Sequence, residues 1–252
     1  MSLSVVVITR NEELNIEACL RSVDFADEII LVDNASSDQT VNLARQCGAK
    51  VVVTHDWPGF GPQKGRALAL ATGDWVLSLD ADERVTPELR QEILSIMAQT
   101  EAADCYSIPR SSWFCGQFMQ HSGWAPDYVD RFFKAGTARF SSDLVHEKLL
   151  HDKPAQRLMS PLLHFSFRNF SDVLTKIDRY STASAEFAFA NGRRATVFSA
   201  IGHGVWTFIR TYVFKAGFLD GNHGLALAIS NAEGSYYRYV KLWQMTQVSP
   251  NT

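Results

Sequence analysis

The sequence lacks the features of a disulfide or zinc framework. Its 252 residues include only four cysteines, and no two of them form a CxxC pair. They lie mostly within stretches of regular periodicity, which is typical of reduced thiols in a cytoplasmic protein. The four are Cys19, Cys47, Cys105 and Cys115.

Targeting and membrane-spanning signals are missing as well. Residues 1–4 lead straight into a β-branched run, without the basic stretch and cleavage site of a signal peptide. No uninterrupted apolar run reaches the roughly 18 residues that a transmembrane helix needs. The 46% of hydrophobic residues suffices for a packed core, so we expect a compact, enzyme-sized protein.

An excess of positive charge and phosphate-binding glycine loops are also absent. Lysine and arginine number 24 against 27 aspartates and glutamates, a net charge of -3, so nucleic acid is not an expected partner. Residues 10–13, which follow the first predicted strand, contain no glycine where a dinucleotide-binding GxGxxG turn would lie. No Walker lysine loop is present. Any phosphate ligand must therefore be bound in another way.

Predicted strands and helices alternate along the first hundred residues. Continuous β-branched runs, typical of parallel strands covered on both faces, predict strands at 4–9, 28–33, 50–55 and 74–80. Helices are predicted after Asn11 as N-cap, over 37–47, around Leu68 and Leu70, and over 87–97. Helical connections imply right-handed crossovers. The fold class is therefore α/β, with a Rossmann-like, mostly parallel sheet flanked by helices.

Polar side chains follow three of these strands. Thr9 ends the first, Asp33 ends the second, and Asp80 and Asp82 end the fourth within "LSLDADE". Ligands of a parallel sheet bind beyond the carboxyl ends of its strands, so these side chains should line one crevice. An acidic crevice can bind a phosphate ligand only if a divalent cation, Mg²⁺ or Mn²⁺, lies between the carboxylates and the phosphate. The alternative is that the two aspartates cap the helix that begins near Thr86.

Four segments together resemble the inverting GT-A glycosyltransferases of family 2. They are "VVVITRNEE", "DEIILVDNASSDQT", "QKGRALALATGDWVLSLDADE" and "LVHEKL". The resemblance covers nearly the whole chain and is closest to the branch that adds a sugar, typically β-linked glucose, to the heptose of the lipopolysaccharide inner core. It implies a UDP-sugar donor, a lipid-linked or oligosaccharide acceptor, and a catalytic domain over 1–168. Residues 1–100 would bind the nucleotide sugar and residues 101–168 would face the acceptor.

The resemblance also implies roles for individual residues. Asp33 would contact the base or ribose, Asp80 the sugar or ribose, and Asp82 would ligate the metal on the diphosphate. The turn that would lie against the nucleotide consists of Thr9, Arg10, Asn11 and Glu12. Gly65 stands where many relatives carry an asparagine, although the neighbouring Lys64 can still reach a phosphate.

A general base and an acceptor site are expected from the middle of the chain. Glu147 aligns with the catalytic acidic residue of the superfamily and is the first candidate for the base; its neighbour His146 is a substrate-binding candidate or a structural histidine. Asp127 is the second candidate, in a stretch similar to the family's D…R-(L/F)-F signature, and with Arg131 it is alternatively a weak local ion pair. Trp124 is a candidate for stacking on a sugar ring or an ordinary core aromatic.

Residues 169–252 are predicted to form a helical, amphipathic region. One helix is expected over 170–191, with Ser171 as its cap and Gly192 at its end. From Gly192 onward the six basic residues are Arg193, Arg194, Arg210, Lys215, Arg238 and Lys241, against Asp220 and Glu233. The region can pack on the catalytic domain, form a dimer contact, or associate peripherally with the anionic cytoplasmic leaflet that presents a lipid-linked acceptor.

Two other classes of function stay open at this point. A nucleotidyltransferase could use a similar sheet and acidic metal site, but it would usually carry a glycine-rich basic loop after its first strand. A non-catalytic nucleotide-sugar binder or scaffold would need the donor motifs and no base.

Overall fold

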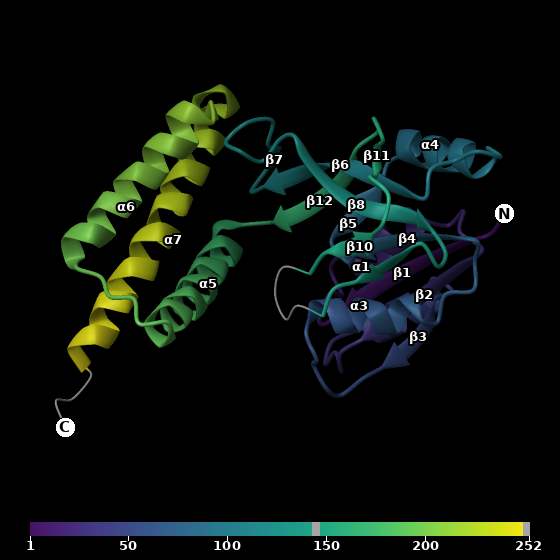
Figure 1. Ribbon diagram of the computed structural model, residues 1–252, viewed down its shortest axis with the longest axis horizontal. Coiled ribbons are helices and arrows are strands. Elements are labelled where there is room, and N and C mark those ends of the chain that lie inside the picture. The colour runs from purple at the N-terminus through teal and green to yellow at the C-terminus, as the bar shows by residue number, and fades with distance from the viewer. Residues whose placement is uncertain (143–146, 249–252) are drawn as a thin grey trace. The chain divides into compact units, whose positions relative to one another are not determined.

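The computed structural model describes residues 1–142 and 147–248 (Figure 1). The chain divides into two compact units, of which the first comprises residues 1–110 and 127–164 and the second residues 111–126 and 165–252. The units differ from the predicted domains mainly in the segment 111–126, which groups with the C-terminal helices. No helix within the described ranges is both long and apolar enough to span a bilayer.

Four parallel strands form the centre of the first unit, in the order β3-β2-β1-β4. They are β1 (Leu3–Thr9), β2 (Glu28–Asp33), β3 (Lys50–Val53) and β4 (Trp75–Asp80). β1 pairs in parallel with both β2 and β4, and in this register Thr9 lies beside Asp33 and Ile8 beside Asp80. The polar ends of three strands therefore reach the same edge of the sheet, as predicted.

Beyond β4 the sheet continues through strands that pair in antiparallel fashion. In spatial order they are β8 (Asp127–Lys134), β6 (Cys105–Phe114), β12 (Leu162–Phe167) and β5 (Glu83–Val85). Arg110 pairs with Asp127 across β6 and β8, and His164 with Glu83 across β12 and β5. The remaining strands are short. β7 (Gln117–Phe118) and β11 (Gln156–Arg157) pair with β6, and β9 (Ala138–Phe140) and β10 (Leu149–His151) pair with each other. The predicted mixed α/β fold is confirmed.

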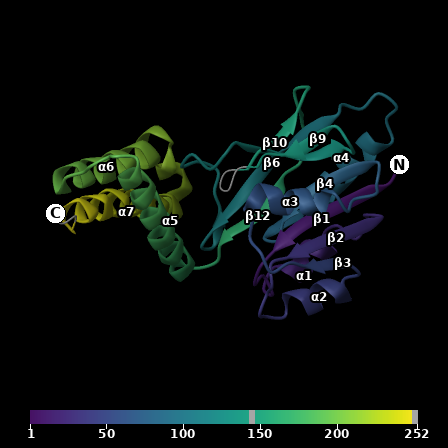
Figure 2. The ribbon, with the colours of Figure 1, turned by 60° about the horizontal axis from the view of Figure 1, so that its bottom comes forward.

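Helices cover both faces of the parallel strands (Figure 2). They are α1 (Ile16–Arg21), α2 (Thr40–Gln46), α3 (Phe60–Leu68) and α4 (Pro87–Met97). Side chains of a strand alternate between faces, so Val5 and Val7 join the core under α1, α2 and α4, whereas Val6 and Ile8 join the core under α3. Burial on both faces explains why these strands read as continuous apolar runs.

Two predicted helix starts in the first unit are wrong, and the residue that caps α4 is identified. α1 begins after Asn15, because Asn11 adopts a left-handed φ of 55° and its Oδ1 accepts a bond from Ser37 N (2.8 Å). α2 begins at Thr40, three residues later than predicted. Thr86 caps α4 by accepting a hydrogen bond from Leu89 N, so Asp80 and Asp82 are not needed as its caps.

The second unit consists mainly of three helices. They are α5 (Phe170–Ala190), α6 (Val197–Ile209) and α7 (Gly221–Val248), with the π-helical turn η1 (Arg210–Phe214) and the 3-10 turn η2 (Gly217–Asp220) between the last two. Both α5 and α6 pack on α7. The cap of α5 is Asn169, whose side chain accepts a hydrogen bond from Asp172 N (3.0 Å), and not the predicted Ser171.

A buried carboxylate explains why segment 111–126 belongs with these helices. Asp220, the last residue of η2, accepts hydrogen bonds from Gln120 N, His121 N and Ser122 Oγ, each at 3.0 Å. Hydrogen bonds to a carboxylate that is shielded from water are among the stronger ones in proteins. The predicted boundary at 168/169 missed this link because it joins residues about 100 positions apart.

Candidate active site

Asp80, the last residue of β4, lies between two cations. Lys64 of α3 places its Nζ 2.8 Å from Asp80 Oδ1, and Arg131 of β8 donates a hydrogen bond to Asp80 Oδ2. Burial opposes ionisation of this carboxyl, but the charges of Arg131 and Lys64 outweigh it and hold the pKa of Asp80 well below its usual range. Both oxygens of Asp80 are therefore engaged by protein cations.

Glu83 supplies a second carboxyl group to Arg131, and burial raises the pKa of this carboxyl above its ordinary value. Its side chain is 0% exposed, Oε2 accepts a hydrogen bond from Asp80 N at 2.9 Å, and Oε1 lies 3.0 Å from Arg131 Nη2. Burial opposes the charge on Arg131, but Asp80 and Glu83 outweigh it and raise the pKa of the guanidinium. Sequence reasoning did not single out Glu83, because nothing in "DADE" indicates which of its carboxylates points inward.

The ion pairs continue in both directions to the two candidate bases. Lys64 Nζ lies 2.7 Å from Glu147 Oε1, and Arg110 joins Glu83 (3.5 Å) to Asp127 (2.7 Å). The side chains of Glu147 and Asp127 are 20% and 37% exposed. The whole series, called here the charge network, is Glu147, Lys64, Asp80, Arg131, Glu83, Arg110 and Asp127. Both candidate bases are thus partly exposed ends of one network, in which Arg131 and Glu83 are buried.

The alternative of a local ion pair between Asp127 and Arg131 is wrong. Asp127 bonds Arg110 on the neighbouring strand, whereas Arg131 reaches Asp80 and Glu83. Four residues along a strand span about 13 Å, so their charged ends lie too far apart to pair. A spacing of four residues brings two side chains together on a helix but not on a strand.

Asp82 has different partners from Asp80. Its Oδ2 lies 3.3 Å from His164 Nε2 of β12, and its side chain is 28% exposed. Among the residues that the structure describes, no group of three or more histidine, cysteine, aspartate or glutamate side chains could hold a metal ion. A Mg²⁺ or Mn²⁺ ion commonly takes one or two protein ligands and fills its shell with water and phosphate oxygens. Asp82 and His164 fit such a diphosphate-borne ion, not an all-protein cage.

The ends of β1 and β2 form the second part of the site. Thr9 Oγ1 is buried and, among the described residues, has no hydrogen-bond partner. Asp33 beside it is fully buried and accepts hydrogen bonds from the backbone N (2.7 Å) and hydroxyl of Ser36. An unpaired buried hydroxyl costs free energy, so it marks a place where a ligand would be stabilised.

The turn after β1 is fixed by hydrogen bonds to the start of α2. Glu12 donates its backbone N–H to Thr40 Oγ1 (2.7 Å), and Asn11 donates its own to Ser36 Oγ (2.8 Å). Arg10, at the beginning of the turn, is exposed. The structure therefore brings all four predicted turn residues to the edge where β1 and β2 end.

Two predicted residues are not joined to this site by the structure. Trp124 belongs to the second unit, where it contacts Phe114 and Phe167. His146 lies outside the described residues.

A glycine that sequence reasoning missed positions Glu147. A Cβ atom added to Gly61, in the first turn of α3, would lie 1.9 Å from Ser141 O and 3.3 Å from Glu147 Cβ. Any larger residue would push away the backbone of Ser141, which is hydrogen-bonded to Lys148 next to Glu147. No signal in the sequence indicates this role, because the contact partners of Gly61 are at least 80 residues further along the chain.

Comparisons with known proteins agree with this geometry. The family "Glycosyl transferase family 2" matches residues 4–159. An uncharacterized glycosyltransferase of Rickettsia typhi is 28% identical over 99% of this chain and 89% of its own length. The lipopolysaccharide core biosynthesis glycosyltransferase LpsC of Rhizobium meliloti is 26% identical over 97% of this chain and 93% of its own.

A solved structure shares the fold. The crystal structure of S. aureus TarS 1-349 superposes with a TM-score of 0.51 at 15% identity, covering 100% of this chain and 93% of that one. At this identity the likeness concerns the fold alone.

Replacing Arg131 should destabilise the first unit strongly. Arg131→Gln leaves the buried Glu83 and the partly exposed Asp80 without their shared cation, so we expect a loss of about 3–5 kcal/mol in the free energy of unfolding. Arg66→Gln is the matched control, because Arg66 pairs with Asp56 (2.5 Å) at the surface and its loss should cost less than about 1 kcal/mol. Urea unfolding followed by circular dichroism measures both; equal losses would contradict the central role of Arg131.

Proposed function

Because this chain belongs to glycosyl transferase family 2 and is a glycosyltransferase, we propose that it transfers glucose from a UDP-sugar to a heptose of the lipopolysaccharide inner core, with inversion. The full-length similarity to LpsC supports an acceptor of the lipopolysaccharide core. The observation that carries the proposal is the charge network, which ends in two accessible carboxylates at the edge where the parallel strands end.

The nucleoside would bind at the ends of β1 and β2. Thr9 offers a buried hydroxyl without a partner, and Asp33 holds the loop that follows β2 in place through Ser36. We assign Asp33 to the base or ribose, directly or through this loop, and the turn from Thr9 to Glu12 to the nucleotide. Lys64, whose ammonium bonds Asp80 and Glu147, stays a candidate for a phosphate contact.

The diphosphate would bind near Asp82. With Asp82 and His164 as ligands, a bound Mn²⁺ or Mg²⁺ ion would supply positive charge to the leaving diphosphate. Asp80, kept ionised by Lys64 and Arg131, would contact the sugar or ribose and favour the positive charge that grows on the sugar ring.

The acceptor hydroxyl needs a base on the opposite face of the sugar. Glu147 is our first choice because it is the more sheltered of the two terminal carboxylates and shares Lys64 with Asp80, the proposed sugar contact. Asp127 is the competing choice, oriented by two hydrogen bonds from Arg110 to its Oδ2 (2.9 and 2.7 Å).

One assay separates this proposal from its alternatives. The protein is incubated with UDP-glucose and Mn²⁺, with and without heptosylated lipid acceptor, and free UDP is measured. Release that depends on the acceptor supports the proposal, and release with another envelope glycan or lipid favours a different acceptor. A nucleotidyltransferase would instead release diphosphate from a nucleoside triphosphate, and a scaffold would release nothing.

Asp82→Ala should remove the metal-dependent part of donor binding. The side chain lost is the carboxylate proposed to ligate the ion, so UDP affinity in Mn²⁺ should fall roughly 10-fold or more, toward the value without metal. Isothermal titration with UDP, with Mn²⁺ and with EDTA, measures the difference. Asp152→Ala, at an exposed aspartate, is the control. An unchanged effect of Mn²⁺ in Asp82→Ala would remove the metal assignment.

Glu147→Gln should separate binding from chemistry. Glutamine keeps the size of the side chain but cannot take a proton, so transfer should fall by roughly 10²-fold or more while UDP affinity stays nearly unchanged. Asp127→Asn is the matched variant at the other end of the charge network. If Asp127→Asn silences transfer in folded protein and Glu147→Gln stays active, the two assignments are reversed. If both stay active, neither is the base and His146 is tested next.

We further propose that α6 lies on the anionic cytoplasmic leaflet. One side of α6, Ala200 and Gly204, is buried, and Gly204 approaches Tyr236 of α7. The other side exposes large apolar side chains: Phe198 (85% exposed), Ile201, Val205, Trp206 and Ile209. Arg193, Arg194, Arg210 and Lys215 flank this stripe. An apolar helix face with basic flanks is typical of helices in the membrane interface.

Co-sedimentation with vesicles tests the membrane proposal. Wild type should bind vesicles containing phosphatidylglycerol more strongly than neutral phosphatidylcholine vesicles, and Trp206→Glu should weaken this binding several-fold. Met159→Glu is the control, because Met159 is an exposed apolar residue of the first unit. A wild-type dimer in light scattering that ignores both kinds of vesicle would show that the stripe is a subunit contact instead.

A further inference from the structure

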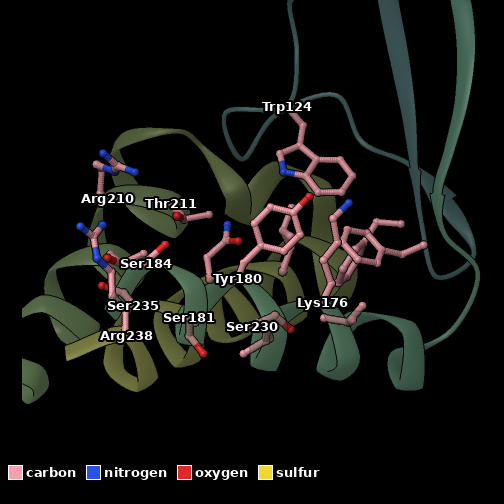
Figure 3. Close-up of a pocket in the computed structure, with 18 residues that line it drawn as sticks. Trp124, Lys176, Tyr180, Ser181, Ser184, Arg210, Thr211, Ser230, Ser235 and Arg238 are labelled. Atoms are coloured by element: carbon pink, nitrogen blue, oxygen red, sulfur yellow. The ribbon is translucent and has the colours of Figure 1, made fainter. Parts of the chain in front are cut away.

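A cavity of about 580 Å³ lies within the second unit (Figure 3). Two helices provide most of its wall: α5 contributes residues from Val173 to Ser184, and α7 contributes residues from Leu227 to Arg238, both at helical spacing. All of its lining residues belong to the second unit. The volume is in the range of ordinary small-molecule sites.

Small polar side chains create this cavity. Facing helices usually fill the space between them with large apolar residues, whereas here α5 presents Ser181 and Ser184, and α7 presents Ser230, Gly234 and Ser235. Ser181 and Ser230 are only 4% and 8% exposed. Ser181 Oγ is engaged by Asp178 O (3.1 Å) and Lys241 Nζ (2.9 Å), whereas the other small polar residues leave a polar space beside the apolar part of the lining.

The cavity is cationic. Lys176, Arg210 and Arg238 line it, and its described lining contains no aspartate or glutamate. Within the described residues, Nε of Arg238 is buried and has no hydrogen-bond partner. A buried donor without an acceptor is costly, so this guanidinium is ready for an anionic group from a ligand.

Aromatic rings occupy another part of the wall. Trp124 stacks against Phe167 with ring centroids 6.1 Å apart, and Lys176 Nζ lies 4.6 Å from the Phe167 ring. Figure 3 shows Trp124 and Lys176 at one end of the cavity, Arg210 and Arg238 at the other, and Tyr180 between them. Aromatic faces, hydroxyls and guanidinium groups in one cavity match the chemistry of a sugar chain that carries an acidic group.

We propose that this cavity binds a saccharide bearing a carboxylate or phosphate group. Its acidic group lies at Arg210 and Arg238, its ring hydroxyls bond the serines of α5 and α7, and a ring lies against Trp124 or Tyr180. The identification of this saccharide as part of the acceptor rests on the proposed function, whereas binding itself does not. Trp124 thereby keeps its predicted role in sugar binding, in the second unit.

A matched pair of disaccharides tests the proposal by isothermal titration. Cellobiuronic acid differs from cellobiose by one carboxylate, and sn-glycerol 3-phosphate carries the anion of a lipid headgroup without a sugar ring. Wild type should bind cellobiuronic acid at least 10-fold more tightly than either of the other two. Arg238→Ala and Arg210→Ala should each weaken it about 10-fold or more, while Arg193→Ala, an exposed arginine outside the cavity, should not.

The outcomes are decisive in both directions. Equal affinity for cellobiose and cellobiuronic acid, or equal behaviour of Arg238→Ala and Arg193→Ala, overturns the proposal. Glycerol phosphate binding as tightly as the disaccharide shows an anion or headgroup site and overturns the saccharide. Circular dichroism checks folding, and Arg210→Ala, at an exposed residue, keeps the test valid if Arg238→Ala unfolds. UDP titration in Mn²⁺ reports on the first unit, so a failure of the proposed function is seen separately.

Discussion

The first unit depends on one interaction, the pairing of the Arg131 guanidinium with Asp80 and Glu83. Asp80 and the fully buried Glu83 lie side by side, and a cation that both of them share offsets the cost of placing two carboxyl groups together there. Arg131 is available because β8 runs antiparallel to β4 and brings its side chain to the end of that strand. The fixed carboxylate of Asp80 then orders Lys64, and Lys64 orders Glu147.

This arrangement gives the neighbouring residues Asp80 and Asp82 different roles. Both side chains are partly exposed, but Asp80 is bound by protein cations on both oxygens, whereas Asp82 has only an imidazole within reach among its described partners. A DxD sequence therefore contains one anchor and one residue suited to an external ligand. The difference comes from the position of Asp80 as the last residue of a buried strand, which points it at α3 and β8.

The helical unit has buried apolar clusters, but it departs from the usual distribution of polarity in two places. Serines, a glycine and arginines lie between α5 and α7, and large apolar side chains of α6 face outward. Neither feature favours folding in water, since buried hydroxyls and exposed aromatic rings both cost free energy relative to the opposite arrangement. Both features are explained if the interior binds a polar ligand and the exterior binds a lipid surface.

The sequence by itself determined the parallel half of the sheet, because continuous β-branched runs and helical periodicity are local signals. It also placed Thr9, Asp33 and Asp80 at one edge, since the carboxyl ends of parallel strands coincide. Helix starts were less certain: Asn15 and Asn169, not Asn11 and Ser171, stand at the N-caps, because several nearby residues have suitable side chains.

Only the tertiary structure decided the charge partners. Arg110, His164 and Gly61 lie between 17 and 86 residues from the groups that they contact in the folded chain, and no local pattern records those contacts. The cavity of the second unit could not be predicted from the sequence either, because the residues that line it meet only when α5 and α7 pack together. Strand and helix formation follows from neighbours in sequence, whereas an ion pair or a cavity requires distant segments to meet.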